Sequence, residues 1–345
     1  MIRPIGYYVH HHGDGHRQRA LAIAAGDPGR VVLLGSGLAG RSGSVAAIDL
    51  PDDRMPATQA FDGADGASSR PLSMHYAPLN HAGVRARMAH VAAWIASAKP
   101  ALMVVDVSVE IALLARLCAT SVAFIRLSGR RDDQPHLEAY RAASLLIAPF
   151  AAALDDVTMP DWVRAKTVYC PGIAVPPPRI AATADSVLVV GGKGGAPLDG
   201  ALIAAAAAAT PNHSWRVIGS AAVPDQYPDN ISFDGWIEDA PAAIAAAGIV
   251  IGGAGDGLLN AVIAAGRPFI CCPEPRPFDE QLQKAQALRS AGAAVVIDAW
   301  TPAQTWPALL ATAAQLDPRR LTALSIIDGA ARTWRLLADF ADRQK

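Results

Sequence analysis

Residues 233–293 decide the fold, and their sequence is FDGWIEDAPAAIAAAGIVIGGAGDGLLNAVIAAGRPFICCPEPRPFDEQLQKAQALRSAGA. The apolar runs in it are short, and glycine or proline bounds each of them, as is typical of buried strands. We expect a buried strand at 248–252, a glycine turn at 253–257 and a helix at 258–265 that residues 266–268 end. A second buried strand at 269–272, a proline-rich loop at 273–277 and a polar-faced helix from residue 279 follow. This alternation indicates a parallel α/β unit.

The glycine turn lies where a strand passes into a helix. The first amides of a helix have no internal partner, and the helix dipole adds about half a positive charge there. Gly253, Gly255 and Gly257 would let the backbone approach a phosphate closely. We therefore expect an anion site at these glycines and at Asp256, although a tight turn without a ligand is the alternative.

The order of these elements resembles the donor-binding half of GT-B glycosyltransferases, above all the family that contains the bacterial peptidoglycan N-acetylglucosamine transferase. The matching pieces are Gly235-Trp236-Ile237, Gly253 to Gly257, Gly266-Arg267-Pro268 and Asp279-Glu280-Gln281. The resemblance covers residues 187–293 well and the N-terminal half more loosely. It implies an α/β protein of the GT-B fold, in which two Rossmann-like domains turn their parallel sheets toward a central cleft.

One position departs from the family pattern. In these families a glutamate about one helical turn after the glycines usually holds the nucleotide ribose, and Ala261 occupies that position here, with Asn260 beside it. Asn260 takes over this role, or the ribose is held differently, or the donor is unusual. The departure bears on the nucleotide more than on the fold.

The resemblance also implies which residues face the donor. Gly191 to Gly195 resembles the loop that approaches the diphosphate and the sugar, and Lys193 in it would neutralise a leaving diphosphate. The donor-binding residues expected besides the glycine turn are Gly192, Lys193, Gly194, Ile237, Asn260, Asp279 and Gln281. Asp279 could instead cap the helix that follows it. A helix is also expected from Pro197, since proline suits a first helical turn.

A second motif, GDGHRQRA at residues 13–20, follows the first apolar strand. It resembles the Gly-x-Gly-His-x-x-Arg loop of GT-B transferases and of the nucleotide-sugar hydrolase of pseudaminic acid synthesis, in which this histidine is catalytic. We expect His16 to act as the base that takes the acceptor proton, since histidine is the side chain that ordinarily exchanges a proton near neutral pH. Gly15 and Arg17 are expected on the acceptor side. A histidine without a role at a helix start is the alternative.

Two further residues are candidates on the acceptor side. Asp106 ends an apolar strand, where a carboxylate could orient a catalytic histidine or could merely cap the next helix near Val109. Arg130 lies in a charged loop, residues 126–133, that could contact an anionic acceptor or simply be solvated.

The run His10, His11 and His12 suggests a metal site as an alternative. Residues 10 and 12 of a strand share a face, and Asp14 and His16 could complete the ligand set. GT-B transferases generally work without a catalytic metal, so we expect neither a metal nor another cofactor.

The composition excludes several classes of protein. The chain has 345 residues, of which 52% are hydrophobic and 18% charged, and its net charge is −1, so nothing indicates binding to nucleic acid. The four cysteines lack zinc-ligand spacing and are expected to be reduced, at Cys118, Cys170, Cys271 and Cys272. Neither a signal peptide nor an apolar run of membrane-spanning length is evident. We expect a cytoplasmic protein, and peripheral contact with the inner membrane face stays open.

Strands and helices alternate along the whole chain. We expect an acceptor-side domain at 1–170, a proline-rich linker at 171–185 and a donor domain at 186–325. By resemblance, a last helix at 326–345 is expected to cross back onto the first domain. The polar stretch 51–78 is long enough to be functional, and acceptor specificity is expected in such loops.

The sequence thus predicts a metal-independent glycosyltransferase that uses a nucleotide-diphosphate sugar, with UDP as the expected nucleotide. The acceptor could be a glycan, a lipid-linked molecule or a small molecule. The alternatives are a nucleotide-sugar hydrolase of the same fold and a non-catalytic nucleotide or sugar binder. A nucleotide-sugar 2-epimerase ranks lower, because such enzymes use several acidic residues around the donor.

Overall fold

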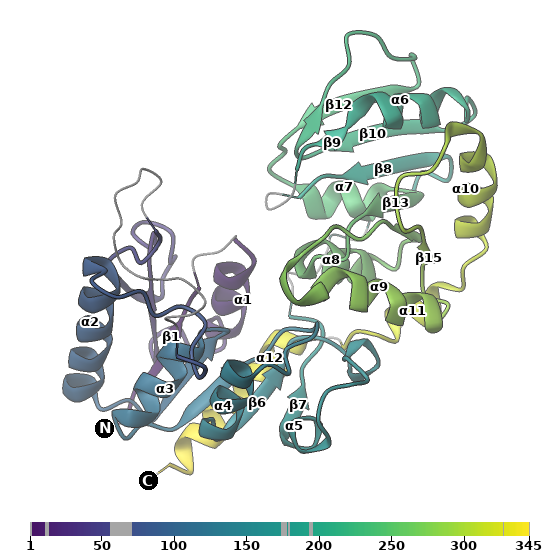
Figure 1. Cartoon of the computed structure of the whole chain (residues 1–345). Coiled ribbons are helices and arrows are strands. Elements are labelled where there is room, and N and C mark those ends of the chain that lie inside the picture. The colour runs from purple at the N-terminus through teal and green to yellow at the C-terminus, as the bar shows by residue number, and fades with distance from the viewer. Residues whose placement is uncertain are drawn as a thin grey trace.

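The computed structural model describes residues 2–10, 14–55, 71–173, 178, 180–192, 196–326 and 328–344. Within these residues the chain forms two large parallel sheets, and Figure 1 shows them in separate halves of the molecule. The predicted GT-B architecture of two Rossmann-like domains is confirmed.

The first sheet has, among the described residues, seven strands in the order β3-β2-β1-β4-β5-β6-β7. These strands are β1 Ile5–Tyr8, β2 Val31–Gly35, β3 Ala46–Asp49, β4 Leu102–Asp106, β5 Val122–Ile125, β6 Leu145–Ala148 and β7 Thr167–Tyr169. The helices of this half are α1 Gly15–Ala24, α2 Ala82–Ala98, α3 Val109–Leu117, α4 Gln134–Ala142, η1 Ala152–Leu154 and α5 Asp161–Lys166. Strands β1, β4, β5 and β6 are buried along their whole length, which explains their continuous apolar sequences.

The second sheet has the strand order β12-β10-β8-β13-β14-β15, with six strands in the described part of the chain. These strands are β8 Ser186–Val190, β10 Ser214–Ile218, β12 Ile231–Gly235, β13 Ile249–Gly252, β14 Phe269–Cys271 and β15 Val295–Val296. The helices are α6 Gly200–Ala208, α7 Ala240–Ala246, α8 Asp256–Ala265, η2 Pro277–Asp279, α9 Glu280–Ser290, η3 Ala303–Thr305, α10 Trp306–Ala314, α11 Pro318–Thr322 and α12 Gly329–Asp342.

The strand order fixes where a ligand site can form. In the first sheet β1 lies beside β4, and in the second β8 lies beside β13, so each sheet reverses its winding direction between these strands. Ligands of such sheets bind outside the carboxyl ends of the strands at the reversal. In the first domain β4 ends at Asp106, and in the second domain Gly191 follows β8 and Gly253 follows β13.

Helix α12 packs against α1 and returns the chain to the first domain (Figure 1). Leu337 and Ala341 of α12 lie in the same buried cluster as strands β1 and β2. Gly26 makes this contact possible, because a Cβ atom there would lie 2.2 Å from Trp334 Cδ1.

The expected helix from Pro197 is wrong in its start. Residues Leu198–Asp199 form a short strand, β9, that pairs with β11, Ala221–Ala222. Helix α6 therefore begins at Gly200, and the Asp199 carboxylate caps it by accepting from the amides of Ala201 and Leu202. No helix of the described chain is long and apolar enough to cross a membrane.

Candidate active site between the two domains

His16 and Asp106 lie together, as the sequence predicts for a catalytic pair. Helix α1 begins directly after the loop that follows β1, and β4 ends at Asp106. The two residues thus stand at the carboxyl ends of adjacent strands, where His16 Nδ1 lies 3.0 Å from Asp106 Oδ1. The His16 side chain keeps 12% of its surface exposed, whereas Asp106 is fully buried.

Asp106 also accepts hydrogen bonds from two other side chains, those of Arg19 and Tyr7. Arg19 donates from Nε to Asp106 Oδ2 at 3.1 Å and from NH2 to Oδ1 at 3.2 Å, and the Tyr7 hydroxyl donates to Oδ2 at 3.4 Å. Burial alone would raise the pKa of Asp106, but Arg19 and His16 hold that pKa well below its usual value. Asp106 is therefore an anion fixed in orientation.

The alternative role of Asp106 as a helix cap is wrong. Helix α3 is capped by Ser108, whose hydroxyl accepts from the amide of Ile111. Asp106 is thus left to act on His16 and Arg19.

Arg19 also reaches the second domain. Its NH1 donates to Asp256 Oδ2 at 3.3 Å, and Asp256 is the first residue of α8. The other oxygen of Asp256 accepts from the ammonium of Lys284 on α9, which is completely buried. Burial would raise the pKa of Asp256, but Lys284 and Arg19 lower it, so this carboxylate stays charged between two cations.

A second ion pair joins the domains at Glu280. Arg131 donates from NH2 to Glu280 Oε2 at 3.1 Å, while Lys284 donates to Oε1 at 3.0 Å. The amide of Arg130 donates to the carbonyl of Phe278 at 2.7 Å. The Arg130 side chain itself is 64% exposed, with its Nε 3.8 Å from Asp279 Oδ2.

Phe278 inserts from the second domain between side chains of the first. Its ring lies 4.6 Å from the Arg131 guanidinium carbon and 4.9 Å from the centre of the His136 ring. Phe278 and Asp279 both have left-handed backbone, at φ 62° and 52°, and this turns the loop toward the first domain. Asp279 makes no capping hydrogen bond with its side chain, so the predicted alternative of a cap is wrong.

Gln281 connects the glycine turn to the proline-rich loop. Its Oε1 accepts from the amide of Ala254 at 2.9 Å and from that of Glu274 at 3.0 Å, and the side chain is buried. A Cβ atom on Gly253 would lie 2.5 Å from this oxygen, so the bond requires glycine there. Gly257 is different, since no atom lies within 4 Å of the position of its Cβ.

The other predicted donor residues lie in different surroundings. Ile237 packs against the buried cluster of the second domain, and Gly192 has open space around its Cβ position. Asn260 lines a cavity of about 570 Å³ formed by α1, α8 and the chain around α11 and the start of α12. Ala261 instead packs against the second-domain core, so the two neighbours face different ways. Lys193 and Gly194 lie outside the described residues.

The start of α1 holds the remaining acceptor-side predictions. Arg17 donates to both carboxylate oxygens of Asp14 at 2.8 Å, so it orders the helix start, and Gly15 has open space around its Cβ position. For the alternative metal site, the rings of His10 and His16 lie 5.6 Å apart, while residues 11 and 12 lie outside the described chain.

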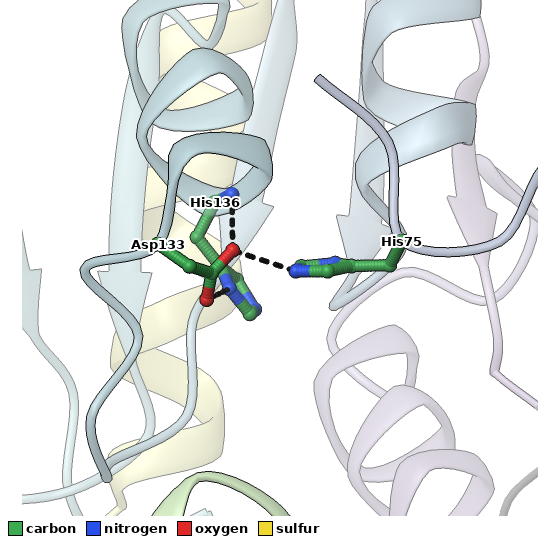
Figure 2. Close-up of side chains that lie close together, drawn as sticks. All are labelled: His75, Asp133 and His136. Atoms are coloured by element: carbon green, nitrogen blue, oxygen red, sulfur yellow. Dashed lines mark hydrogen bonds and ion pairs between the residues drawn. The ribbon is translucent and has the colours of Figure 1, made fainter. Parts of the chain in front are cut away.

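A second polar cluster joins His75, Asp133 and His136 (Figure 2). Their potential ligand atoms lie within 4.8 Å of one another, so among the described residues they could hold a metal ion. Asp133 accepts from His75 Nε2 at 2.7 Å and from His136 Nδ1 at 2.6 Å. His136 Nε2 in turn accepts from Arg131 at 3.3 Å.

These contacts favour a hydrogen-bonded cluster over a metal site. A metal on Nδ1 of His136 would leave the remaining proton on Nε2, opposite the Arg131 donor. Burial lowers the pKa of His136 to about 4, so the ring is neutral at pH 7 and can accept from Arg131.

Comparison with known proteins agrees with the fold. Residues 217–305 match the profile of the glycosyltransferase family 28 C-terminal domain. Over 107 residues the chain is 36% identical to UDP-N-acetylglucosamine--N-acetylmuramyl-(pentapeptide) pyrophosphoryl-undecaprenol N-acetylglucosamine transferase of Rhodopseudomonas palustris (strain BisB18). That match covers 30% of this chain and 28% of the relative, so it spans less than a third of that protein.

Solved structures resemble the whole chain. The glycotransferase of kitacinnamycin superposes with a TM-score of 0.69 at 15% identity over 99% of both chains. The calicheamicin glycosyltransferase CalG4 gives 0.67 at 16% identity, again over 99% of both chains. MurG of Acinetobacter baumannii gives 0.62 at 17% identity over 98% of this chain and 99% of that one. The chain therefore has the GT-B fold, and residues 217–305 are similar to the C-terminal domain of glycosyltransferase family 28.

Proposed function

We propose that this chain transfers a sugar from a nucleotide-diphosphate sugar to an acceptor hydroxyl. The observation that carries the proposal is the contact between domains, where His16 and Asp106 of the first domain stand one arginine away from the N-terminus of α8. This arrangement supports the proposal, because glycosyl transfer needs a base and an anion site close together, and His16 and the start of α8 would supply them.

In the proposed step the acceptor oxygen attacks the anomeric carbon of the sugar. Its proton passes to Nε2 of His16 as the new carbon–oxygen bond forms. The bond from that carbon to the diphosphate breaks, and its electron pair leaves with the diphosphate. Asp106 keeps the other proton on Nδ1 and stabilises the charged imidazole that results.

The diphosphate would bind at the amides of the turn before α8, with the helix dipole behind it. Arg19 and Lys284 supply positive charge there, and both already pair with Asp256. Lys193 would add a further cation. No step of this scheme requires a metal.

The relatives suggest the substrates. The curated relative is named for transfer of N-acetylglucosamine from its UDP derivative to an undecaprenol-linked acceptor. We extend this to a UDP-sugar donor and a lipid-linked acceptor for this chain, which would act at the cytoplasmic face of a membrane.

Donor turnover tests the proposal. The purified chain is incubated with UDP-N-acetylglucosamine and other UDP- and dTDP-sugars, with and without polyprenyl-diphosphate-linked acceptors, and nucleotide release and sugar products are measured. His16→Ala should lower the rate at least about 100-fold. His90→Ala, at an exposed position of α2, is the matched control and should not.

The same assay separates the alternatives. Rapid release of free sugar without an acceptor would instead indicate a nucleotide-sugar hydrolase. Donor binding without turnover under any condition would indicate a binding protein. Equal rates for His16→Ala and the parent chain would remove His16 from the mechanism.

A further inference from the structure

His16 Nδ1 has two hydrogen-bonding neighbours, one of which is an acceptor and the other a donor. Asp106 Oδ1, an acceptor, lies 3.0 Å away, and the NH2 donor of Arg19 also lies 3.0 Å away. A neutral imidazole carries one ring proton, so Nδ1 either donates to Asp106 or accepts from Arg19. Only the first tautomer leaves Nε2 without a proton and able to act as a base.

The other hydrogen bonds of Arg19 decide between these tautomers. Its NH2 and Nε have acceptors in the two oxygens of Asp106, at 3.2 and 3.1 Å. Its NH1 has an acceptor in Asp256 Oδ2 at 3.3 Å. Arg19 therefore does not need the His16 nitrogen, whereas the second tautomer would set the Nδ1 lone pair against the Asp106 carboxylate.

Asp256 can restrain Arg19 without losing its own second partner. Lys284 uses Oδ1 of Asp256, and Arg19 uses Oδ2, so the carboxylate bridges α1 of the first domain and α9 of the second. The side chain of Arg19 is 7% exposed, so few water molecules can replace Asp256 as its partner.

We propose that Arg19 is a positioning residue that completes His16 as a base only when the second domain supplies Asp256. The inference rests on the proposed function, in which Nε2 of His16 takes the acceptor proton. With Asp256 in contact, Arg19 stays on the carboxylates and Nδ1 donates to Asp106. Without it, NH1 has lost its acceptor and the guanidinium turns toward Nδ1, so the ring proton moves to Nε2. One side chain thereby links the approach of the domains to the formation of the base.

The tautomer can be measured directly by NMR on the full chain labelled with ¹⁵N histidine, without donor or acceptor, near pH 8. The His16 signals are assigned by their loss in His16→Gln. We expect the parent chain to carry the proton on Nδ1. Asp256→Asn should raise the share with the proton on Nε2 about tenfold, as expected for the loss of one charge-assisted hydrogen bond.

Asp234→Asn is the matched control. It breaks an ion pair inside the second domain, Arg216 with Asp234, and touches neither Arg19 nor the contact between the domains. We expect its tautomer ratio to equal that of the parent chain. An equal shift in Asp234→Asn and Asp256→Asn, or no shift in Asp256→Asn, would overturn the proposal.

A second variant covers the case in which Asp256→Asn does not fold. Arg19→Lys keeps the charge, but a single ammonium cannot replace the three nitrogens that contact Asp106 and Asp256. Its Nε2-protonated share should rise as well, and an unchanged ratio in a folded Arg19→Lys protein would also contradict the proposal.

Kinetics separate this role from donor binding. In Asp256→Asn, kcat should fall by the same factor as the share of His16 that carries its proton on Nδ1, because fewer molecules hold the reactive tautomer. A change confined to KM would mean that Asp256 acts only on the donor. The tautomer measurement needs no turnover, so a chain with the expected tautomers but no transferase activity would reject the proposed function and leave this link intact.

Discussion

Gly129→Ala should open the contact between the two domains. Gly129 has a φ of 97°, and a Cβ atom there would lie 2.5 Å from the Phe278 carbonyl oxygen and 3.0 Å from the Cα of Glu280. Both atoms belong to the backbone of the second domain, so no side-chain rotation relieves the overlap. The loop that carries Phe278 must move away.

The contacts that Gly129→Ala would break determine how far the domains open. They are the hydrogen bond from the Arg130 amide to Phe278, the packing of Arg131 on the Phe278 ring and the ion pair of Arg131 with Glu280. The hydrogen bond contributes about 1 kcal/mol and the cation–π contact about 1–2 kcal/mol. Loss of both shifts the balance between closed and open forms by roughly 100-fold.

Gly40→Ala is the matched control. Gly40 also has a positive φ, 67°, but no atom lies within 4 Å of its Cβ position. Both variants incur the cost of alanine in a left-handed conformation, about 1 kcal/mol. Only Gly129→Ala also disturbs the second domain.

Small-angle X-ray scattering and kinetics read out the opening. Gly129→Ala should show a larger radius of gyration than Gly40→Ala, and its kcat/KM should be at least about tenfold lower. Identical scattering curves and equal activity for the two variants would refute the reasoning about this contact.

Four further results are expected. Asp106→Asn should lower kcat about 100-fold or more with little change in KM, whereas Asp132→Asn, at an exposed position, should match the parent in steady-state kinetics. Burial lowers the pKa of His136 to about 4, below the roughly 6.5 of an unfolded chain, so stability present above pH 6.5 should fall by about 3 kcal/mol toward pH 4. Urea unfolding should show this loss in the parent and not in His136→Gln, and parallel curves would contradict it. Gly253→Ala should reduce the free energy of unfolding by about 1–3 kcal/mol, since its Cβ meets Gln281 Oε1 at 2.5 Å, while Gly257→Ala should be neutral. Activity should remain complete in excess EDTA, and a strict metal requirement would count against the scheme.

The sequence predicted the elements of the site better than their contacts. His16 and Asp106 were predicted as site residues because each lies where a strand ends and a helix begins, and the carboxyl ends of parallel strands meet at one edge of the sheet. The contact between them needed the strand order β1 beside β4, which no local pattern contains.

Arg19 could have been found, since it lies three residues after His16 and so on the same face of α1. Lys284 could have been found in a similar way, since it lies four residues after Glu280 on the same face of α9. Their shared partner, Asp256, comes from another domain or another helix, so its role depends on the tertiary structure.

Two features depend on geometry that the local sequence does not contain. Asn260 stays a candidate for the role of the missing ribose glutamate, and it lies on a different face of α8 from Ala261, since successive helix residues point about 100° apart. Asn260 therefore faces α1, whereas Ala261 faces the second-domain core. The cluster of His75, Asp133 and His136 joins a loop to the start of α4 across 58 residues of sequence, and nothing in the spacing indicates it.

Calorimetric titration of the purified chain with UDP, dTDP, GDP and ADP tests the central claim most directly. The account predicts that one of these nucleotides binds with micromolar affinity and that this nucleotide is UDP. It also predicts that Asp256→Asn changes the dissociation constant of that nucleotide. Failure of all four to bind would contradict a nucleotide-sugar site at the start of α8.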